Sequence, residues 1–190
     1  MTWIAGSLWD LIVPRSKRPQ RNGVTPADKK PARRADRQPV NAAPTVTGAA
    51  RAKKSSMQDR YDALVEEMKA AYNVRVRKWR KSSSGVAWTI RYIRSGRVVK
   101  LIEAPYPRGP MSCAIFLHEI GHHAIGLGVY KPRCLEEFHV WVWALDKMRE
   151  QGFNVTPAVE KRMERSMRYA IAKARRRGIR EVPAELQQYL

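Results

Sequence analysis

The residues best suited to chemistry are two histidines and a glutamate within the segment His118-Glu119-Ile120-Gly121-His122. Positions four residues apart lie on one face of a helix about one turn apart, so both imidazoles can reach one tetrahedral metal ion. Glu119 lies beside them without facing the metal directly, which suits a general base that takes a proton from a metal-bound water. The spacing therefore predicts a zinc (Zn2+) site with His118 and His122 as ligands and Glu119 as the catalytic residue.

A catalytic zinc needs a third protein ligand and an open fourth position. The segment Glu136-Glu137-Phe138-His139 follows the motif closely, and two helices joined by a short loop are usually antiparallel neighbours. We therefore expect a carboxylate from this segment to complete the site, with Glu137 as the first choice and Glu136 as the second. His139 is a further alternative, because imidazole also binds zinc. Two imidazoles and a carboxylate suit several divalent ions besides zinc.

The elements that must position these residues begin near Ser56, where Ser56-Met57-Gln58-Asp59 is typical of a capped helix start. Apolar residues then recur at helical spacing up to Tyr72. Three segments rich in β-forming residues follow, and two turn-like segments separate them. Since parallel connections need long crossovers, we expect these strands to form a three-stranded antiparallel meander. The predicted strands cover residues 74–79, 86–93 and 97–102, and the turns contain Ser82–Gly85 and Ser95-Gly96.

Helical patterns and glycine stops predict three further helices. They are a metal helix over residues 112–127, a ligand helix over 132–150 and a C-terminal helix over 157–177, with a short terminal helix within 181–190. The predicted fold class is therefore α+β.

The chain is strongly basic, and its formal net charge of +20 favours anionic partners such as nucleic acid. Residues 1–55 are rich in Pro, Ala, Arg and Lys, with few large apolar side chains between 14 and 54, and we expect them to form a basic, largely disordered region. Residues 56–190 form the predicted domain that carries the metal site, with a helical C-terminal extension. Two cysteines, Cys113 and Cys134, and the lack of a long apolar run indicate a cytoplasmic protein without a transmembrane segment.

The motif and the glutamates that follow it resemble the zincin metallopeptidases with a downstream glutamate ligand, particularly the minimal ImmA/IrrE-like and SprT-like forms. The resemblance covers roughly residues 57–150 and includes the run Trp141-Val-Trp-Ala-Leu145 after the glutamate pair. It implies hydrolysis of peptide bonds in a protein partner, often a regulatory protein in a phage, prophage or plasmid setting, with the peptide along an edge strand. Tyr106 and Tyr130 flank the motif helix and are candidates for stabilising the oxyanion.

A second interpretation is a basic nucleic-acid-binding or adaptor protein whose metal site is structural. Phosphate contacts would come from basic runs in both tails, and from a stripe on the sheet in which arginines alternate with aromatic residues. The runs are Arg33-Arg34, Lys53-Lys54 and Arg175–Arg177, and the stripe contains Arg75, Arg77, Trp79, Trp88, Arg91, Tyr92 and Arg94. Glu119 separates the two hypotheses, because a structural metal site does not need its carboxylate.

Overall fold

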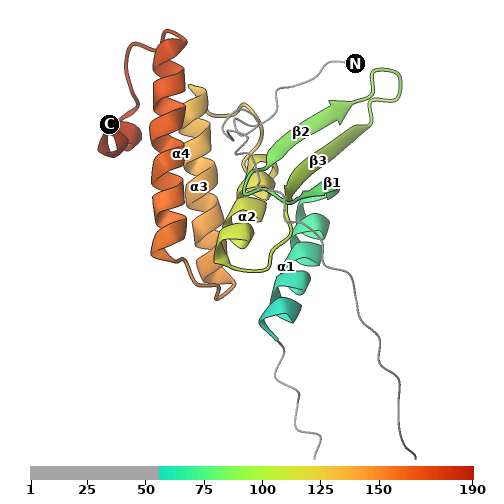
Figure 1. Cartoon of the computed structure of the whole chain (residues 1–190). Coiled ribbons are helices and arrows are strands. Elements are labelled where there is room, and N and C mark those ends of the chain that lie inside the picture. The colour runs from blue at the N-terminus through green and yellow to red at the C-terminus, as the bar shows by residue number, and fades with distance from the viewer. Residues whose placement is uncertain (1–55) are drawn as a thin grey trace, which may run out of the picture. The chain divides into compact units, whose positions relative to one another are not determined.

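The computed structural model describes residues 56–190 (Figure 1). The predicted disordered region over residues 1–55, including its basic pairs, lies outside the described residues. In chain order the elements are α1 (Met57–Tyr72), β1 (Val74–Arg80), β2 (Val86–Arg91), β3 (Val98–Pro105), α2 (Pro110–Ala124), α3 (Arg133–Glu150), α4 (Pro157–Arg176) and the 3-10 helix η2 (Ala184–Tyr189). The α+β class and the predicted order of helices are confirmed.

Helix α1 begins as the sequence predicts. The Ser56 side chain accepts a hydrogen bond from the Asp59 amide, and the Asp59 carboxylate accepts one from the Ser56 amide. This reciprocal cap satisfies two of the amides that a helix start leaves without partners. The helix ends at Asn73, which takes the left-handed conformation with φ of 50° and leads directly into β1.

The sheet is mixed, so the predicted antiparallel meander is wrong. Its order is β1-β3-β2, with β3 in the middle, parallel to β1 and antiparallel to β2. The length of a connection fixes the relative direction of two strands but not their adjacency. Five extended residues span about 17 Å, and two strands on either side of a third lie only about 10 Å apart. The short loop between β1 and β2 can therefore cross the end of β3.

The burial of the strands distinguishes β3 from β1. Ile102, Glu103 and Ala104 are consecutive and all buried, as expected of a strand covered on both sides, whereas β1 carries exposed charges that suit an edge. The buried Glu103 carboxylate pairs with Arg77 and Arg80 of β1. These ion pairs attach β1 to the central strand.

Helix α2 is the centre of the packing. It contacts β3 on one side and α3 on the other, and α4 lies along α3 (Figure 1). Every residue of α2 from Cys113 to His123 is buried, including the whole motif. Helix α4 contributes Val159, Met163, Met167, Ala170 and Ile171 to the same core. The predicted C-terminal extension is thus an integral part of the domain.

No helix among residues 56–190 combines the length and the apolar character needed to cross a bilayer.

Candidate metal centre

Helices α2 and α3 bring the predicted ligands together at their interface. Proline at the first position of α2 has a backbone angle already suited to a helix, and the Ser112 hydroxyl accepts hydrogen bonds from the amides of Arg108 and Gly109. After α2 ends, the chain reverses through a glycine-containing loop and enters α3 at Arg133. The two helices are therefore adjacent, as the short connection predicts.

Gly121, inside the motif, allows the two helices to approach closely. A β-carbon at this position would lie 2.9 Å from Trp143 Cε3 and 3.1 Å from Val140 Cγ1. Both contacts are shorter than the usual 3.5–4.0 Å, so a larger residue would push α3 or its side chains away. Glycine lowers helix stability, and at this position that cost is offset by the close packing of α2 against α3.

His118, His122 and Glu137 form one buried cluster. Their donor atoms all lie within 4.8 Å of one another. Glu137 Oε2 is 3.2 Å from His118 Nε2 and 3.8 Å from His122 Nε2, and the three side chains are at most 3% exposed. This cluster could hold a metal ion. All three are residues that the motif and the glutamates after it predict as ligands.

The unused hydrogen-bonding capacity of the histidines provides an independent test of that fit. Within residues 56–190, His118 Nδ1, His118 Nε2 and His122 Nε2 are buried without a hydrogen-bond partner, although the two Nε2 atoms lie close to Glu137. Buried polar atoms without partners are costly, and here the two Nε2 atoms converge on Glu137 Oε2. A divalent cation among them would satisfy the two Nε2 lone pairs and the Glu137 charge together.

Glu136 occupies a different position from Glu137. Its Oε1 lies 3.1 Å from His122 Nδ1, and its Oε2 accepts a hydrogen bond of 2.7 Å from the Gly128 amide. Because a carboxylate accepts, His122 Nδ1 donates, which leaves the Nε2 lone pair directed toward Glu137. A carboxylate that fixes the tautomer and orientation of a ligand histidine is a common second partner in metal sites. This geometry favours Glu137 over Glu136 as the third ligand.

Arg133 links both glutamates to the start of α3. Its Nη1 lies 3.0 Å from Glu136 Oε1, and its Nε donates a hydrogen bond of 3.2 Å to Glu137 Oε1. Burial alone would raise the pKa of Glu137, but His122, His118 and Arg133 together lower it to about 2. Burial lowers the pKa of His118 to about 4. At neutral pH the cluster therefore presents a carboxylate and, at His118, a neutral imidazole, which are the forms that bind metal.

Glu119 is fully buried and lies against Gly85, at the start of β2. A β-carbon on Gly85 would overlap the Glu119 carboxylate, with Oε1 only 2.5 Å away. Arg162 of α4 donates a hydrogen bond of 2.7 Å to the Ser83 carbonyl, which attaches the same loop to the helical side of the domain. The predicted general base is thus held between the metal helix and the first residues of an edge strand.

The remaining candidates are separate from the cluster. His139 stacks on Tyr130 with ring centroids 4.0 Å apart, and the Tyr106 hydroxyl donates a hydrogen bond of 2.7 Å to Asp62. His123, which directly follows the motif and was not a predicted ligand, donates through Nε2 to the Leu101 carbonyl at 3.1 Å, so it attaches α2 to the central strand. The side chains of these residues therefore make contacts that hold the fold together, and none of them belongs to the His118, His122 and Glu137 cluster.

The proposed basic and aromatic stripe on the sheet is divided in the structure. Trp88 is buried, and Arg77 is paired with Glu103, whereas Trp79 and Tyr92 are each 37% exposed. Arg77 lies over the Trp88 ring, whereas Trp79 packs against Tyr106 and Phe116. The residues therefore do not form one continuous face of the kind that stacks on successive bases.

Three residues of the site were missed by sequence reasoning: Gly85, Gly121 and Arg133. A glycine within a predicted helix is the signal that could have identified Gly121, because it commonly marks a close approach of backbones or side chains. Arg133 lies one turn before Glu137 on α3, at the spacing of an i, i+4 ion pair, which is a weaker signal. Nothing in the sequence marks Gly85 as a neighbour of Glu119.

Comparison with known proteins finds no matching family model, no matching curated protein and no matching solved structure. The functional interpretation therefore depends on the residues and geometry of the site.

Proposed function

We propose that this protein is a zinc-dependent peptidase in which His118, His122 and Glu137 hold the metal and Glu119 is the general base. The observation that carries the proposal is the convergence of two unpartnered imidazole nitrogens and one carboxylate oxygen beside a buried glutamate. A structural zinc site usually has four protein ligands, whereas three ligands and an adjacent carboxylate are typical of a hydrolytic site.

In this proposal zinc would supply Lewis acidity at the scissile carbonyl. Glu119 would take a proton from the attacking water as the water oxygen bonds to the carbonyl carbon. As the carbon–nitrogen bond breaks, Glu119 would return that proton to the leaving amine nitrogen. Glu136 and Arg133 would hold the ligands in place and would take no part in proton transfer.

The position of β2 supports a peptide substrate. β2 is an edge strand of the described sheet, and it begins at Val86, next to the glycine that contacts Glu119. An extended peptide that added to this edge would pass the site at its first residues. Because the site residues are almost fully buried, we expect the segment Ser82–Gly85 to move when a peptide binds.

Metal content is the first test. The full chain, purified without a metal-binding tag, should contain about one zinc per molecule, and the His118→Ala/His122→Ala variant should contain none. Glu137→Gln should weaken binding more than Glu136→Gln, since only Glu137 contacts both Nε2 atoms. A folded wild-type chain that takes up no zinc would refute the site.

Catalysis requires a second test, because the metal alone does not distinguish a peptidase from a binding protein. Glu119→Gln should keep the zinc and lose cleavage of a proteome-derived peptide library, with new termini counted by mass spectrometry. Loss of a general base lowers rates about 10²–10⁴-fold. If the zinc-loaded wild type cleaves nothing, or if Glu119→Gln cleaves equally well, the basic binding protein becomes the better account.

A further inference from the structure

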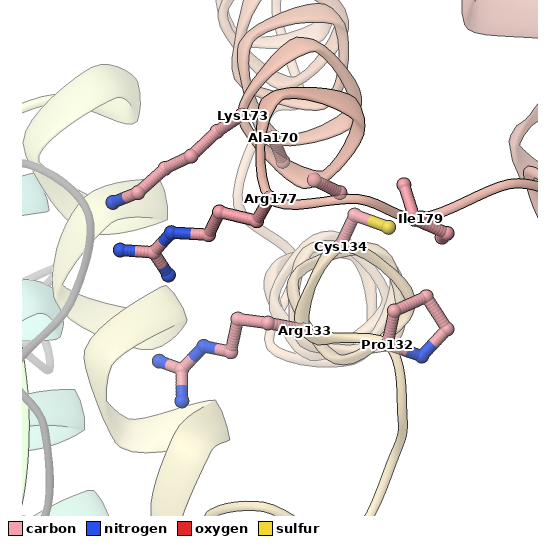
Figure 2. Close-up of a pocket in the computed structure, with 8 residues that line it drawn as sticks. Pro132, Arg133, Cys134, Ala170, Lys173, Arg177 and Ile179 are labelled. Atoms are coloured by element: carbon pink, nitrogen blue, oxygen red, sulfur yellow. The ribbon is translucent and has the colours of Figure 1, made fainter.

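A second feature of the domain is a cavity of about 180 Å³ between the start of α3 and the C-terminal end of α4. Figure 2 shows the ends of three cationic side chains on one side of it and apolar groups on the other. The cationic residues are Arg133, Lys173 and Arg177, and the other lining residues are Pro132, Cys134, Ala170, Ala174 and Ile179.

The cations have more positive charge than the nearby protein neutralises. Lys173 and Arg177 form no ion pair with a carboxylate among residues 56–190, and Arg133 Nη2 is buried there without a hydrogen-bond partner. Arg133 uses its Nε on Glu137 and its Nη1 on Glu136, so its Nη2 is left with unused hydrogen-bonding capacity among the described residues. Three positive charges lie close together, and only Arg133 is paired with carboxylates, those of Glu136 and Glu137. This excess of positive charge favours an anionic ligand.

This cavity adjoins the metal centre, because Arg133 belongs to both. The charges also influence one another: burial, followed by the charge of Arg177, lowers the pKa of Lys173, and the Glu137 charge partly opposes this. A group bound at the three cations would therefore lie next to the metal ligands.

The dimensions of the cavity limit the ligand. Pockets that hold whole small molecules usually measure about 300–1,000 Å³, so this cavity suits a single side chain or a chain terminus. The apolar wall would contact a short methylene stem, and the cationic side would bind the charged end. A carboxylate at the tip of a short aliphatic group fits both requirements.

We propose that this cavity binds a carboxylate of the peptide substrate next to the scissile bond, so that the enzyme selects acidic peptides. The carboxylate can come from an acidic side chain or from the C-terminus of the substrate. This inference rests on the proposed function for its position in the reaction, but carboxylate binding can be measured without turnover.

The test uses the zinc-loaded full chain with the substitution Glu119→Gln. Its binding of three tripeptides is measured by isothermal titration. One peptide has a central glutamate and an amidated end, one has a central alanine and a free carboxylate, and one has a central glutamine and an amidated end. We expect at least one carboxylate peptide to bind at least tenfold more tightly than the glutamine peptide. The preferred peptide identifies the source of the carboxylate.

The same titrations on two added pairs of substitutions assign the preference to the cavity. Lys173→Gln/Arg177→Gln should abolish it, whereas Arg175→Gln/Arg176→Gln removes the same charge from the same end of α4 at positions that do not line the cavity, and should leave it unchanged. Zinc content and far-UV circular dichroism of all variants should match the parent, which excludes misfolding as the cause.

Three results would overturn the inference: equal binding of all three peptides, equal effects of the two pairs of substitutions, or a loss of binding to a duplex oligonucleotide confined to the Lys173/Arg177 variant. The last result would assign the cavity to nucleic acid. Cleavage of the peptide library without any acidic preference would refute this inference and leave the proposed function intact. An acidic preference in binding, with no cleavage by the wild type, would refute the proposed function and leave only the binding of a carboxylate in the cavity.

Discussion

Replacing Gly121 with alanine should loosen the metal cluster without removing any of its donor atoms. The added β-carbon would lie 2.9 Å from Trp143 Cε3 and 3.1 Å from Val140 Cγ1. Restoring a carbon contact of about 3.5 Å requires a movement of about 0.6 Å at Trp143. Val140 is one turn after Glu137 on α3, so a shift of this part of the helix also moves the ligand.

The expected loss of metal affinity follows from that movement. Ligand distances in metal sites are held within about 0.2 Å, so a shift about three times larger should raise the dissociation constant for zinc at least tenfold, or about 1.4 kcal/mol. Overpacking typically costs about 1–3 kcal/mol of stability. The higher helix propensity of alanine returns about 1 kcal/mol. The metal-free variant should therefore be at most about 2 kcal/mol less stable than wild type.

Competition with a chelating dye measures the zinc affinity, and urea unfolding of the metal-free protein measures the stability. Gly109→Ala is the control, because a β-carbon at that position, the N-cap of the same helix, meets nothing within 4 Å. A Gly121→Ala variant that binds zinc as tightly as wild type would refute the reasoning. Such a result would mean that Trp143 moves alone and that the close approach of the helices does not set the ligand geometry.

Three further predictions concern other parts of the domain. Gly85→Ala should preserve zinc content and reduce cleavage at least tenfold in a peptide-library assay, because its methyl group displaces Glu119; unchanged cleavage would contradict this. Glu103→Gln should lower the urea-derived free energy of unfolding by about 1.5–3 kcal/mol at pH 7, by removing charged hydrogen bonds to two arginines of β1. Although burial alone would raise the pKa of Glu103, those bonds lower it below its usual 4.5 in the folded state. The wild-type advantage should therefore be complete above about pH 4.5 and should disappear as the pH falls through the folded pKa; an advantage that persists in acid would contradict it. Burial raises the pKa of Cys113 to about 12 and also raises that of Cys134. Neither thiol should react with iodoacetamide at pH 8 until the chain unfolds, as mass spectrometry of the intact protein would show.

Local sequence signals predicted the helices and the placement of the motif on one helix face. Ser56 and Asp59 form the expected cap, and the spacing of His118 and His122 places both on one face of a buried helix. These features depend on residues a few positions apart, and helix geometry alone relates them. The same holds for the adjacency of α2 and α3, which the short loop between them requires.

Features that depend on distant parts of the chain could not be predicted in the same way. The choice between Glu136 and Glu137 depends on the rotation of α3 about its axis, because neighbouring helical residues point about 100° apart. Val140 and Trp143, which lie against Gly121, contribute to fixing that rotation. The adjacency of β1 and β3 depends on the path of one five-residue loop, which tolerates either arrangement.

The order of the strands also has a consequence for how the chain reaches its folded state. The innermost β2–β3 pair, Arg91 and Val98, is separated by seven positions, whereas the first β1–β3 pair, Val74 and Lys100, is separated by 26. Closing the longer loop costs about 1 kcal/mol more chain entropy. The hairpin should therefore form before β1 docks, and substitutions in its turn should slow folding, while those in β1 should mainly accelerate unfolding. The strand that is first in the sequence would be the last to join the sheet.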